Sequence, residues 1–391
     1  MRVAYVCADP GVPVLGSKGA SIHVQQIVRA FRRRGDEVTV YCTRAGSGSA
    51  EVLDGARVVS RAVGRGEAAE RERSVARAAG ELAELATQDG CDLVYERYSL
   101  FSDAAMRVGA ASIIEVNAPL IEEQRDYRTL SDETRAVATT RRLFSGASVV
   151  ACVSDPVAGW ARTHGAARPL IAPNGVDTRS FRPALIDDGS LRIVFVGSLK
   201  PWHGVDVALD AIDGIEGVEL TVLGDGPERE SLEQRARERG APVRFLGALP
   251  HADVPAMLSG MHVGLAPYPA DAGDYFSPLK AYEYLAAGLA VIASAVGQLP
   301  ELLRGGESGI LVPPSDSAAL RRAIIDLRDD RAQARRLGRE ARRQAVRSHD
   351  WDRTLDGILS GLDADERISE GQRNAMGIDV VERLTGTGTA R

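Results

Sequence analysis

The chain has 391 residues, 44% of them hydrophobic, and a formal net charge of −6. This length predicts two or three domains, and the acidic balance excludes nucleic acid as the main partner because nucleic-acid binding needs surplus basic charge. The opening stretch RVAYVCAD is typical of a buried strand, not of a signal peptide, and no apolar run reaches the roughly 20 residues of a membrane span. We therefore expect a cytoplasmic protein whose four cysteines are reduced, buried thiols.

Short apolar runs alternate with helical patterns along the first half of the chain, which predicts βα units and a parallel sheet. The predicted helices span residues 21–34, 67–86 and 131–144. The predicted strands are RVAYVCA, EVTVYCT, DLVYER, SIIEVN and SVVACVS. We place this first Rossmann-like domain at residues 1–184.

A segment rich in Gly, Pro and Asp, IAPNGVDTRSFRPALIDDGS, comes before a second series of strands. These strands are LRIVFVGS, VELTVLG, VRFLG, VGLAPY, AVIAS and GILVPP. They predict a second doubly wound domain at 185–345, followed by a helix at 346–365 that packs back toward the first domain and a weakly ordered polar tail at 366–391. Because open parallel sheets bind ligands beyond the carboxyl ends of their strands, we expect the site in a cleft between the two domains.

Lysine is rare in this chain and its positions are informative. Lysine and arginine together number 48, but the only lysines are Lys18, Lys200 and Lys280. Lys18 and Lys200 each follow the first strand of a domain, and Lys280 opens a predicted helix. Lysine delivers a compact charge that can follow its target, whereas arginine is planar and bidentate. A diphosphate leaving group is one such target; the alternative is that three solvated lysines escaped replacement by arginine.

The stretch YFSPLKAYEYLAAG, residues 275–288, predicts an anion site at a helix start. Ser277 is a suitable N-cap and Pro278 suits the first helical position. The N–H groups of Leu279 and Lys280 are then free to bind an anion. One turn later, Glu283 is placed to accept hydrogen bonds from two ribose hydroxyls, or else to pair with Lys280 on the helix surface.

Several segments of the chain resemble family 4 of the retaining glycosyltransferases, which have the GT-B fold. The segments FSPLKAYEYLAAGLAVIAS and GQLPELLRGGESGILVPPSD resemble its donor-site signature, and IAPNGVDTRSFRP resembles its interdomain signature. Further similar segments are GSKGASIHVQQIVRAFRRRGDEVTV, VGSLKPWHGVDVALDAI, LTVLGDGPERE and VRFLGALPHADVPAML. The resemblance, from about residue 2 to 360, implies two Rossmann-like domains facing across a cleft and transfer of a hexose-type sugar from a nucleotide-sugar co-substrate, with no cofactor.

The resemblance also implies roles for individual residues. Gly19 allows the backbone to approach the diphosphate, and Glu283 holds the ribose. The amides around Ser277 and Lys280 bind the phosphates, a stretch to which Phe276 and Leu279 also belong. Ser198 and His203 occupy the places of a basic pair that is common in the family, so we expect Lys200 to supply the charge. Lys200 and Lys280 are the predicted catalytic cations.

Three positions depart from the family pattern. The first acid of a pair eight residues apart is here Tyr275, with Asp274 beside it, which puts recognition of the sugar hydroxyls in question. Asn117 replaces a histidine of the acceptor half; it can hydrogen-bond a sugar hydroxyl as a third catalytic candidate, but it cannot be a cation. His23, like Lys18, is a candidate for contact with sugar or acceptor, although a partly buried structural role explains His23 equally well.

The expected mechanism needs neither a metal nor a protein base. The leaving phosphate oxygen itself receives the acceptor's proton, as proposed for retaining members of the family, while lysines and helix N–H groups stabilise the diphosphate. The D-x-D motif at Asp363 to Asp365 starts the tail and is remote from the predicted site. We therefore predict no metal site.

Other functions fit less well. GVPVLGSK lacks the GK pair of a P-loop, and GDGPER lacks the third glycine of a dinucleotide site. A nucleotide-sugar 2-epimerase of the same fold and a non-catalytic nucleotide-sugar-binding partner subunit stay open. The acceptor also stays open, as a small molecule or a lipid or glycan, because the basic helix end at Arg32, Arg33 and Arg34 fits either contact with anionic lipid or an ordinary solvated C-terminus.

Overall fold

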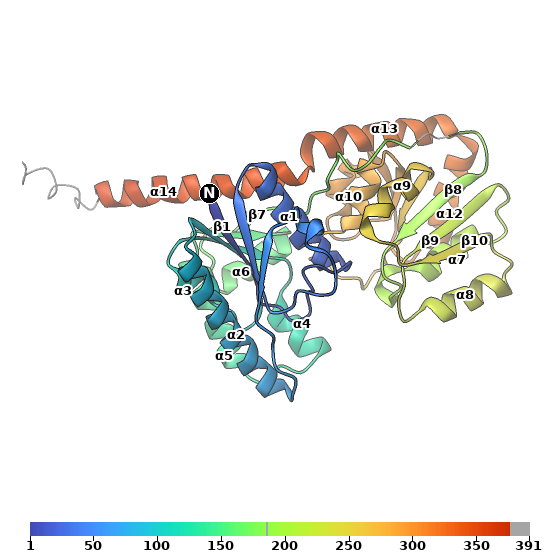
Figure 1. The fold of residues 1–391 in the computed structure, drawn as a ribbon. Helices are drawn as coiled ribbons and strands as arrows, with labels where there is room; N and C mark the ends of the chain where they lie inside the picture. Colours follow the sequence, from blue (N-terminus) through green and yellow to red (C-terminus); the bar gives the residue numbers. More distant parts are fainter. Residues whose placement is uncertain (185–186, 376–391) are drawn as a thin grey trace, which may run out of the picture.

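The computed structural model describes residues 1–184 and 187–375, with side chains up to residue 363. It contains two α/β domains side by side, each built on one parallel sheet (Figure 1). Each strand predicted from the sequence is present. The short strands β3 and β7 were not predicted, because they have only four and two residues and are partly exposed.

The first domain has a seven-stranded sheet in the order β3-β2-β1-β4-β5-β6-β7, in which neighbouring strands are parallel. The strands are β1 (Arg2–Cys7), β2 (Glu37–Cys42), β3 (Arg57–Ser60), β4 (Leu93–Arg97), β5 (Ala111–Val116), β6 (Val149–Cys152) and β7 (Leu170–Ile171). The helices are α1 (Gly19–Arg33), α2 (Ala68–Asp89), α3 (Ala104–Val108), α4 (Leu120–Tyr127), α5 (Glu133–Gly146) and α6 (Asp155–Thr163), with a 3₁₀ turn η1 (Ala50–Leu53). Helices cover both faces, so the central strands are buried along nearly their whole length instead of alternating between buried and exposed positions.

The second domain has a six-stranded parallel sheet in the order β10-β9-β8-β11-β12-β13. The strands are β8 (Leu191–Val196), β9 (Val218–Leu223), β10 (Val243–Gly247), β11 (Val263–Ala266), β12 (Ala290–Ser294) and β13 (Gly309–Val312). The α-helices are α7 (Val205–Ile212), α8 (Arg229–Glu238), α9 (Val254–Ser259), α10 (Leu279–Ala286), α11 (Leu299–Leu302), α12 (Ser317–Asp329) and α13 (Arg331–Ser348). The 3₁₀ turns are η2 (Pro201–His203), η3 (His251–Asp253) and η4 (Arg304–Gly306). In each sheet the strand order reverses beside the first strand of the domain, β1 or β8. Such a switch point opens a ligand crevice at the carboxyl ends of the strands.

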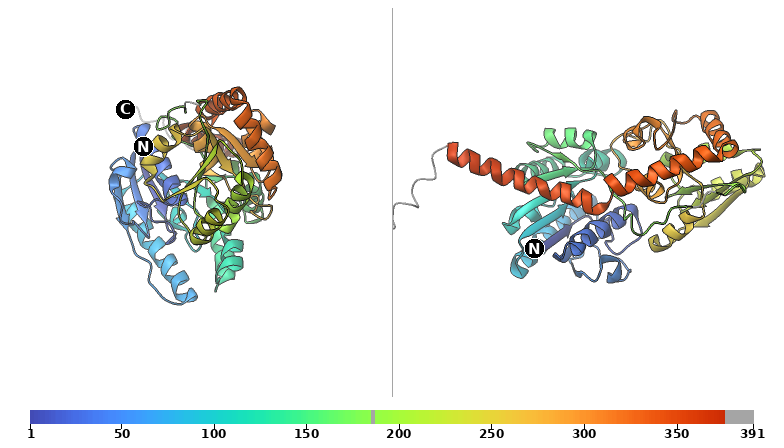
Figure 2. Two further views of the ribbon diagram at one scale, coloured as in Figure 1. Left: turned by 90° about the vertical axis from the view of Figure 1, so that its right-hand side faces the viewer. Right: turned by 90° about the horizontal axis from the view of Figure 1, so that it is seen from above.

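The last helix, α14 (Trp351–Ala375), follows α13 and packs on the first domain (Figure 2). Trp351, Leu355 and Ile358 are buried in the core of that domain. The ring of Trp351 makes an edge contact with His23, at 4.9 Å between centroids. The helix continues to Ala375, so part of the segment predicted as a weakly ordered tail is helical; residues 376–391 lie outside the described part.

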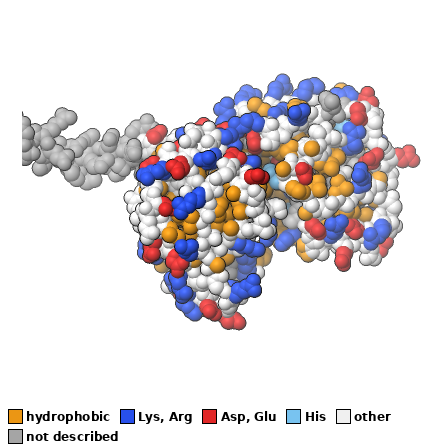
Figure 3. Space-filling view, in the orientation of Figure 1, with side chains coloured by type: hydrophobic (Ala, Val, Ile, Leu, Met, Phe, Trp, Pro, Cys, Tyr) orange, Lys and Arg blue, Asp and Glu red, His pale blue; other side chains and the backbone are white. Residues whose placement is uncertain are grey.

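The basic end of α1 is paired within the chain. Arg33 bonds Asp352 at 2.5 Å, and Arg34 bonds Asp356, both on α14. These ion pairs disfavour the interpretation of this helix end as a lipid contact. Figure 3 shows Lys and Arg side chains gathered instead along the upper edge of the molecule, where α13 lies. No helix in the described part of the chain is both long and apolar enough to cross a bilayer.

Candidate active site

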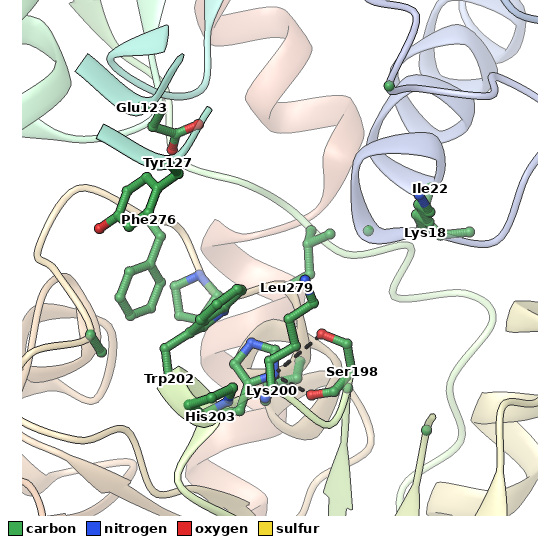
Figure 4. Close-up of a pocket in the computed structure, with 18 of the residues that line it drawn as sticks. Lys18, Ile22, Glu123, Tyr127, Ser198, Lys200, Trp202, His203, Phe276 and Leu279 are labelled. Atoms are coloured by element: carbon green, nitrogen blue, oxygen red, sulfur yellow. Dashed lines mark hydrogen bonds between the residues drawn. The ribbon is translucent and has the colours of Figure 1, made fainter. Parts of the chain in front are cut away.

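A cleft of about 2520 Å³ lies between the two domains. Loops that follow β1, β4 and β5 line it from the first domain, and loops that follow β8, β9, β10 and β11 line it from the second. These loops leave the carboxyl ends of the strands, so the two sheets direct their ligand-binding edges into one space. Figure 4 shows side chains from both domains around this space.

Lys280 is the second residue of α10 and is only 8% exposed. Lys280 lines the cleft, and its buried Nζ atom has no hydrogen-bond partner among the described residues. Nζ lies 4.0 Å from the centroid of the Phe195 ring and 5.1 Å from that of Tyr268. Burial lowers the pKa of this amine to about 7, while Glu283 has an opposing effect. A Cβ added to Gly197 would lie 2.9 Å from Nζ, so glycine leaves the space that this lysine fills.

Lys200 lies on the same wall of the cleft, in the loop after β8. Its Nζ lies 4.7 Å from the centroid of the half-exposed Trp202 ring. His203 Nδ1 donates to the Ser198 carbonyl oxygen at 2.5 Å. Burial and the charge of Lys280 lower the pKa of His203 to about 3, so the imidazole is neutral. Ser198 and His203 thus shape this wall, and the two lysines carry its positive charge.

The start of α10 differs from the prediction at Ser277. The helix begins at Leu279 with Pro278 as N-cap, and no side chain caps it. The Ser277 hydroxyl instead accepts from the Asn174 N–H at 3.2 Å, because the interdomain linker packs against this loop. Ala281 N–H makes the first turn by donating to the Pro278 carbonyl. The amides of Leu279 and Lys280 precede that bond and have no hydrogen-bond partner among the described residues.

Glu283 lines the cleft one turn beyond Lys280, but its partner is a residue that the sequence did not single out. His251 Nε2 contacts Glu283 Oε1 at 2.8 Å. His251 lies in η3, directly after the loop that leaves β10, and lines the cleft as well. Its place after a strand of the parallel sheet is the signal that would have identified it.

The glycine loop of the first domain faces the start of α10. Gly19 begins α1, and a Cβ added there would lie 3.6 Å from Leu279 Cδ1 in the other domain. Lys18, the exposed N-cap of α1, lines the cleft beside it (Figure 4). The structure therefore brings together Lys18, Gly19, Lys200, Lys280 and Glu283.

Tyr275 also lines the cleft, with Phe276 next to it, but Asp274 does not. Asp274 is exposed outside the lining. The Tyr275 hydroxyl donates to Glu123, on α4 of the first domain. Glu123 is a cleft carboxylate that sequence reasoning missed, since only the fold brings α4 to this loop.

The structure does not bring His23 or Asn117 into the cleft lining. His23 is buried and its Nε2 lies 2.6 Å from Glu115 Oε1. Asn117 Nδ2 donates to the other oxygen of Glu115 at 3.2 Å. Burial opposes ionisation of Glu115, but His23 and Arg97 outweigh it and lower its pKa to about 2. The expected cleft contact of His23 is wrong, because α1 turns this side chain into the core against Trp351.

The described residues form no cluster of metal-ligating side chains. No group of three or more His, Cys, Asp or Glu side chains there is arranged to hold a metal ion. Asp363 lies on α14 and is exposed, away from the cleft. The cysteines are free thiols; Cys7, Cys42 and Cys152 are buried as expected, but Cys91 is only partly buried because it lies just before β4.

Two facing parallel-sheet domains with a cleft at their strand ends define the GT-B class of glycosyltransferase folds. Residues 17–180 match the family described as Glycosyltransferase Family 4, and residues 190–330 match the family described as Glycosyl transferases group 1. The two matches follow one another and together take in most of the chain. The chain belongs to the family 4 glycosyltransferases.

Known proteins support this class both by sequence and by fold. The chain is 29% identical over 197 residues to a glycogen synthase of Mycobacterium tuberculosis. The matched region covers 48% of this chain and 46% of that protein. The chain is also 34% identical over 209 residues to a phosphatidyl-myo-inositol mannosyltransferase of Mycobacterium leprae, covering 51% and 54%. The chain thus spans about half the length of these relatives. In fold, it is similar to Anabaena HepE solved with UDP and glucose, with a TM-score of 0.71, 18% identity, and coverage of 93% and 100%.

Proposed function

We propose that the protein is a retaining glycosyltransferase that moves a hexose-type sugar from a nucleotide-sugar donor to an acceptor hydroxyl. The observation that carries this proposal is the buried amine of Lys280, a cleft-lining residue in the first turn of α10, which has no hydrogen-bond partner among the described residues. An unpaired polar group in a buried position is costly unless a ligand satisfies it. A diphosphate supplies the missing negative charge.

The chemistry then follows from where charge develops. When the bond between the sugar and the diphosphate breaks, negative charge grows on the leaving phosphate oxygens. Lys280, Lys200 and the amides of Leu279 and Lys280 are already in place to stabilise that charge without reorganisation. These lysines take the role that a divalent metal has in other phosphate sites.

The proton of the acceptor hydroxyl goes to the leaving phosphate oxygen, so the reaction needs no separate protein base. Acceptor and leaving group then lie on the same face of the sugar, and its anomeric configuration is retained. Glu283 accepts hydrogen bonds from the ribose hydroxyls and holds the nucleotide while this exchange takes place.

The relatives suggest where to begin with substrates. The solved HepE complex contains UDP and glucose, and one curated relative is named as a mannosyltransferase of a phosphatidyl-inositol. We therefore propose UDP-hexoses and GDP-mannose as first donors, and polyols or lipid-linked polyols as first acceptors.

The test is incubation of the purified protein with UDP-glucose, UDP-galactose or GDP-mannose and a panel of these acceptors, followed by mass spectrometry. Free nucleotide together with a new glycoside supports the proposal, and an anomeric NMR signal that matches the donor's configuration supports retention. An isomerised donor would identify a 2-epimerase. Binding without turnover of any donor would identify a non-catalytic partner subunit.

A further inference from the structure

Glu123 and Tyr275 make a hydrogen bond across the cleft, from one domain to the other. Glu123 lies on α4 of the first domain, and Tyr275 lies in the loop that precedes α10 of the second. The Tyr275 hydroxyl donates to Glu123 Oε1. The backbone of the same tyrosine is held from the first domain too, because Ser154 Oγ donates to the Tyr275 carbonyl at 2.8 Å. Tyr275 is therefore placed by both domains.

This pair lines the same cleft as the predicted phosphate site. Tyr275 precedes Lys280 by five positions, and both line the cleft along with Glu123. The amides at the start of α10 bind the diphosphate in the proposed function. A group attached to that diphosphate and available to an acceptor must extend from the second domain toward the first. The place where Glu123 meets Tyr275 lies on that path.

The pair has hydrogen-bonding capacity left for a ligand. The second carboxylate oxygen of Glu123, Oε2, has no hydrogen-bond partner among the described residues. Burial and the contact with Glu123 raise the pKa of Tyr275, which keeps the phenol protonated as a donor while its oxygen can still accept. Sugar hydroxyls both donate and accept, so a carboxylate oxygen and a phenol oxygen side by side can bind two of them.

The surroundings suit a sugar as well. Figure 4 shows the rings of Tyr127 and Phe276 beside Glu123. Tyr127 lines the cleft and is 82% exposed. Such high exposure is unusual for a large aromatic side chain. Aromatic faces pack against the C–H faces of sugars, while carboxylates bind the hydroxyls. Asp274 lies outside the cleft lining and does not compete for this role.

We propose that Glu123 and Tyr275 together bind the hydroxyl groups of the donor's sugar, so that sugar recognition requires residues from both domains. The inference rests on the proposed donor site, because it assumes that the diphosphate lies at α10. It assigns a specificity role to a carboxylate of the first domain.

The test compares a nucleotide with the corresponding nucleotide sugar by calorimetry, using UDP against UDP-glucose and GDP against GDP-mannose. The variants are Glu123→Gln, Tyr275→Phe and the double variant. Glu84→Gln is the matched control, since it makes the same exchange at an exposed acid of α2 in the first domain that lies outside the cleft lining. Circular dichroism confirms folding of each protein.

We expect each single variant to keep its affinity for the bare nucleotide within about twofold and to lose about tenfold for the nucleotide sugar, as for one hydrogen bond to a charged group. The double variant should lose no more than the more affected single variant, because the pair acts as a unit. Equal losses for nucleotide and nucleotide sugar, or no loss for either, would overturn the proposal and leave the pair as a contact between domains. If neither nucleotide binds to the unmodified protein, the proposed function fails instead.

Discussion

Lys280 and Glu283 lie one turn apart on α10, yet they do not pair with each other. Glu283 Oε1 is 2.8 Å from His251 Nε2, and the Lys280 amine is without a hydrogen-bond partner in the described structure. The surface ion pair that the sequence left open as an alternative is therefore absent. Each side chain is directed to a different part of the cleft, the lysine to the phosphates and the glutamate to the ribose in the proposed function.

Nucleotide binding should weaken as the pH rises above neutrality. The pKa of Lys280 is lowered to about 7 by burial, so the free site loses its ammonium above that pH and must regain a proton to bind a diphosphate. His203, whose pKa is about 3, stays neutral throughout this range. We expect UDP affinity to fall by up to about tenfold per pH unit between pH 7 and 9. Calorimetry in buffers of different ionisation enthalpy should show that about one proton is taken up for each UDP bound at pH 8.

The control for this pH effect is Lys280→Met, which binds UDP more weakly and should show little pH dependence over the same range. Equal UDP affinity of the unmodified protein at pH 7 and pH 9 would contradict the assignment.

The two cleft lysines should not be replaceable by arginine. Lys280→Arg places a larger guanidinium in space closed by Phe195 and Gly197, and Lys200→Arg exchanges a compact charge for a planar one. Lys→Met at either position should lower kcat and kcat/KM together by on the order of 10²- to 10³-fold, as for a contact made mainly in the transition state. Steady-state kinetics test this, with the exposed Lys18→Met as a comparison that should lose less. Near-normal rates for both arginine variants would mean that lysine is no special requirement.

Glu283→Ala should weaken nucleotide binding by roughly 1.5 to 3 kcal/mol, the range for loss of hydrogen bonds to a charged group. The substitution also frees His251, which then has no carboxylate partner to orient it. Calorimetry with UDP and with 2′-deoxy-UDP separates the two effects, since only the ribose contact depends on the hydroxyl. Glu230→Ala, an exposed acid on α8 away from the cleft, is the control. Unchanged affinity in folded Glu283→Ala would return this glutamate to a structural role.

Transfer should persist in excess EDTA. The proposed cations are side chains, and no described group of three or more metal-ligating residues lies in the cleft. Product formation is measured by mass spectrometry with and without the chelator, and again after addition of magnesium or manganese. Complete loss that either ion restores would reject the role given to the lysines.

Trp351→Ala should destabilise the protein by about 3 to 5 kcal/mol, as for other truncations of large buried aromatic residues. Trp351 is 1% exposed in the core of the first domain and contacts His23, although it follows the second domain in sequence. Chemical denaturation measures the change in the free energy of unfolding. Trp202→Ala, at a half-exposed ring, should cost less than about 1 kcal/mol. Similar values for the two variants would contradict the view that α14 is part of the first domain's core.

Local patterns were sufficient for the architecture. Apolar runs such as those of β1 and β8 alternate with helical patterns, and parallel strands buried on both faces leave that signature in any short window. The same holds for the start of α10, where the position of Lys280 relative to the helix could be predicted without knowledge of its neighbours. The capping role of Ser277 could not, because Asn174 of the linker competes for its hydroxyl.

The sequence by itself determined the two α/β domains, the family, and the side of each sheet on which the lysines lie, since these depend on the order and spacing of nearby residues. Only the tertiary structure decided which side chains meet. His251 meets Glu283, Glu123 meets Tyr275, and His23 turns into the core against Trp351. These pairs are 32, 152 and 328 positions apart. Contacts over such separations depend on how whole helices and domains pack, and no local pattern in the chain records that.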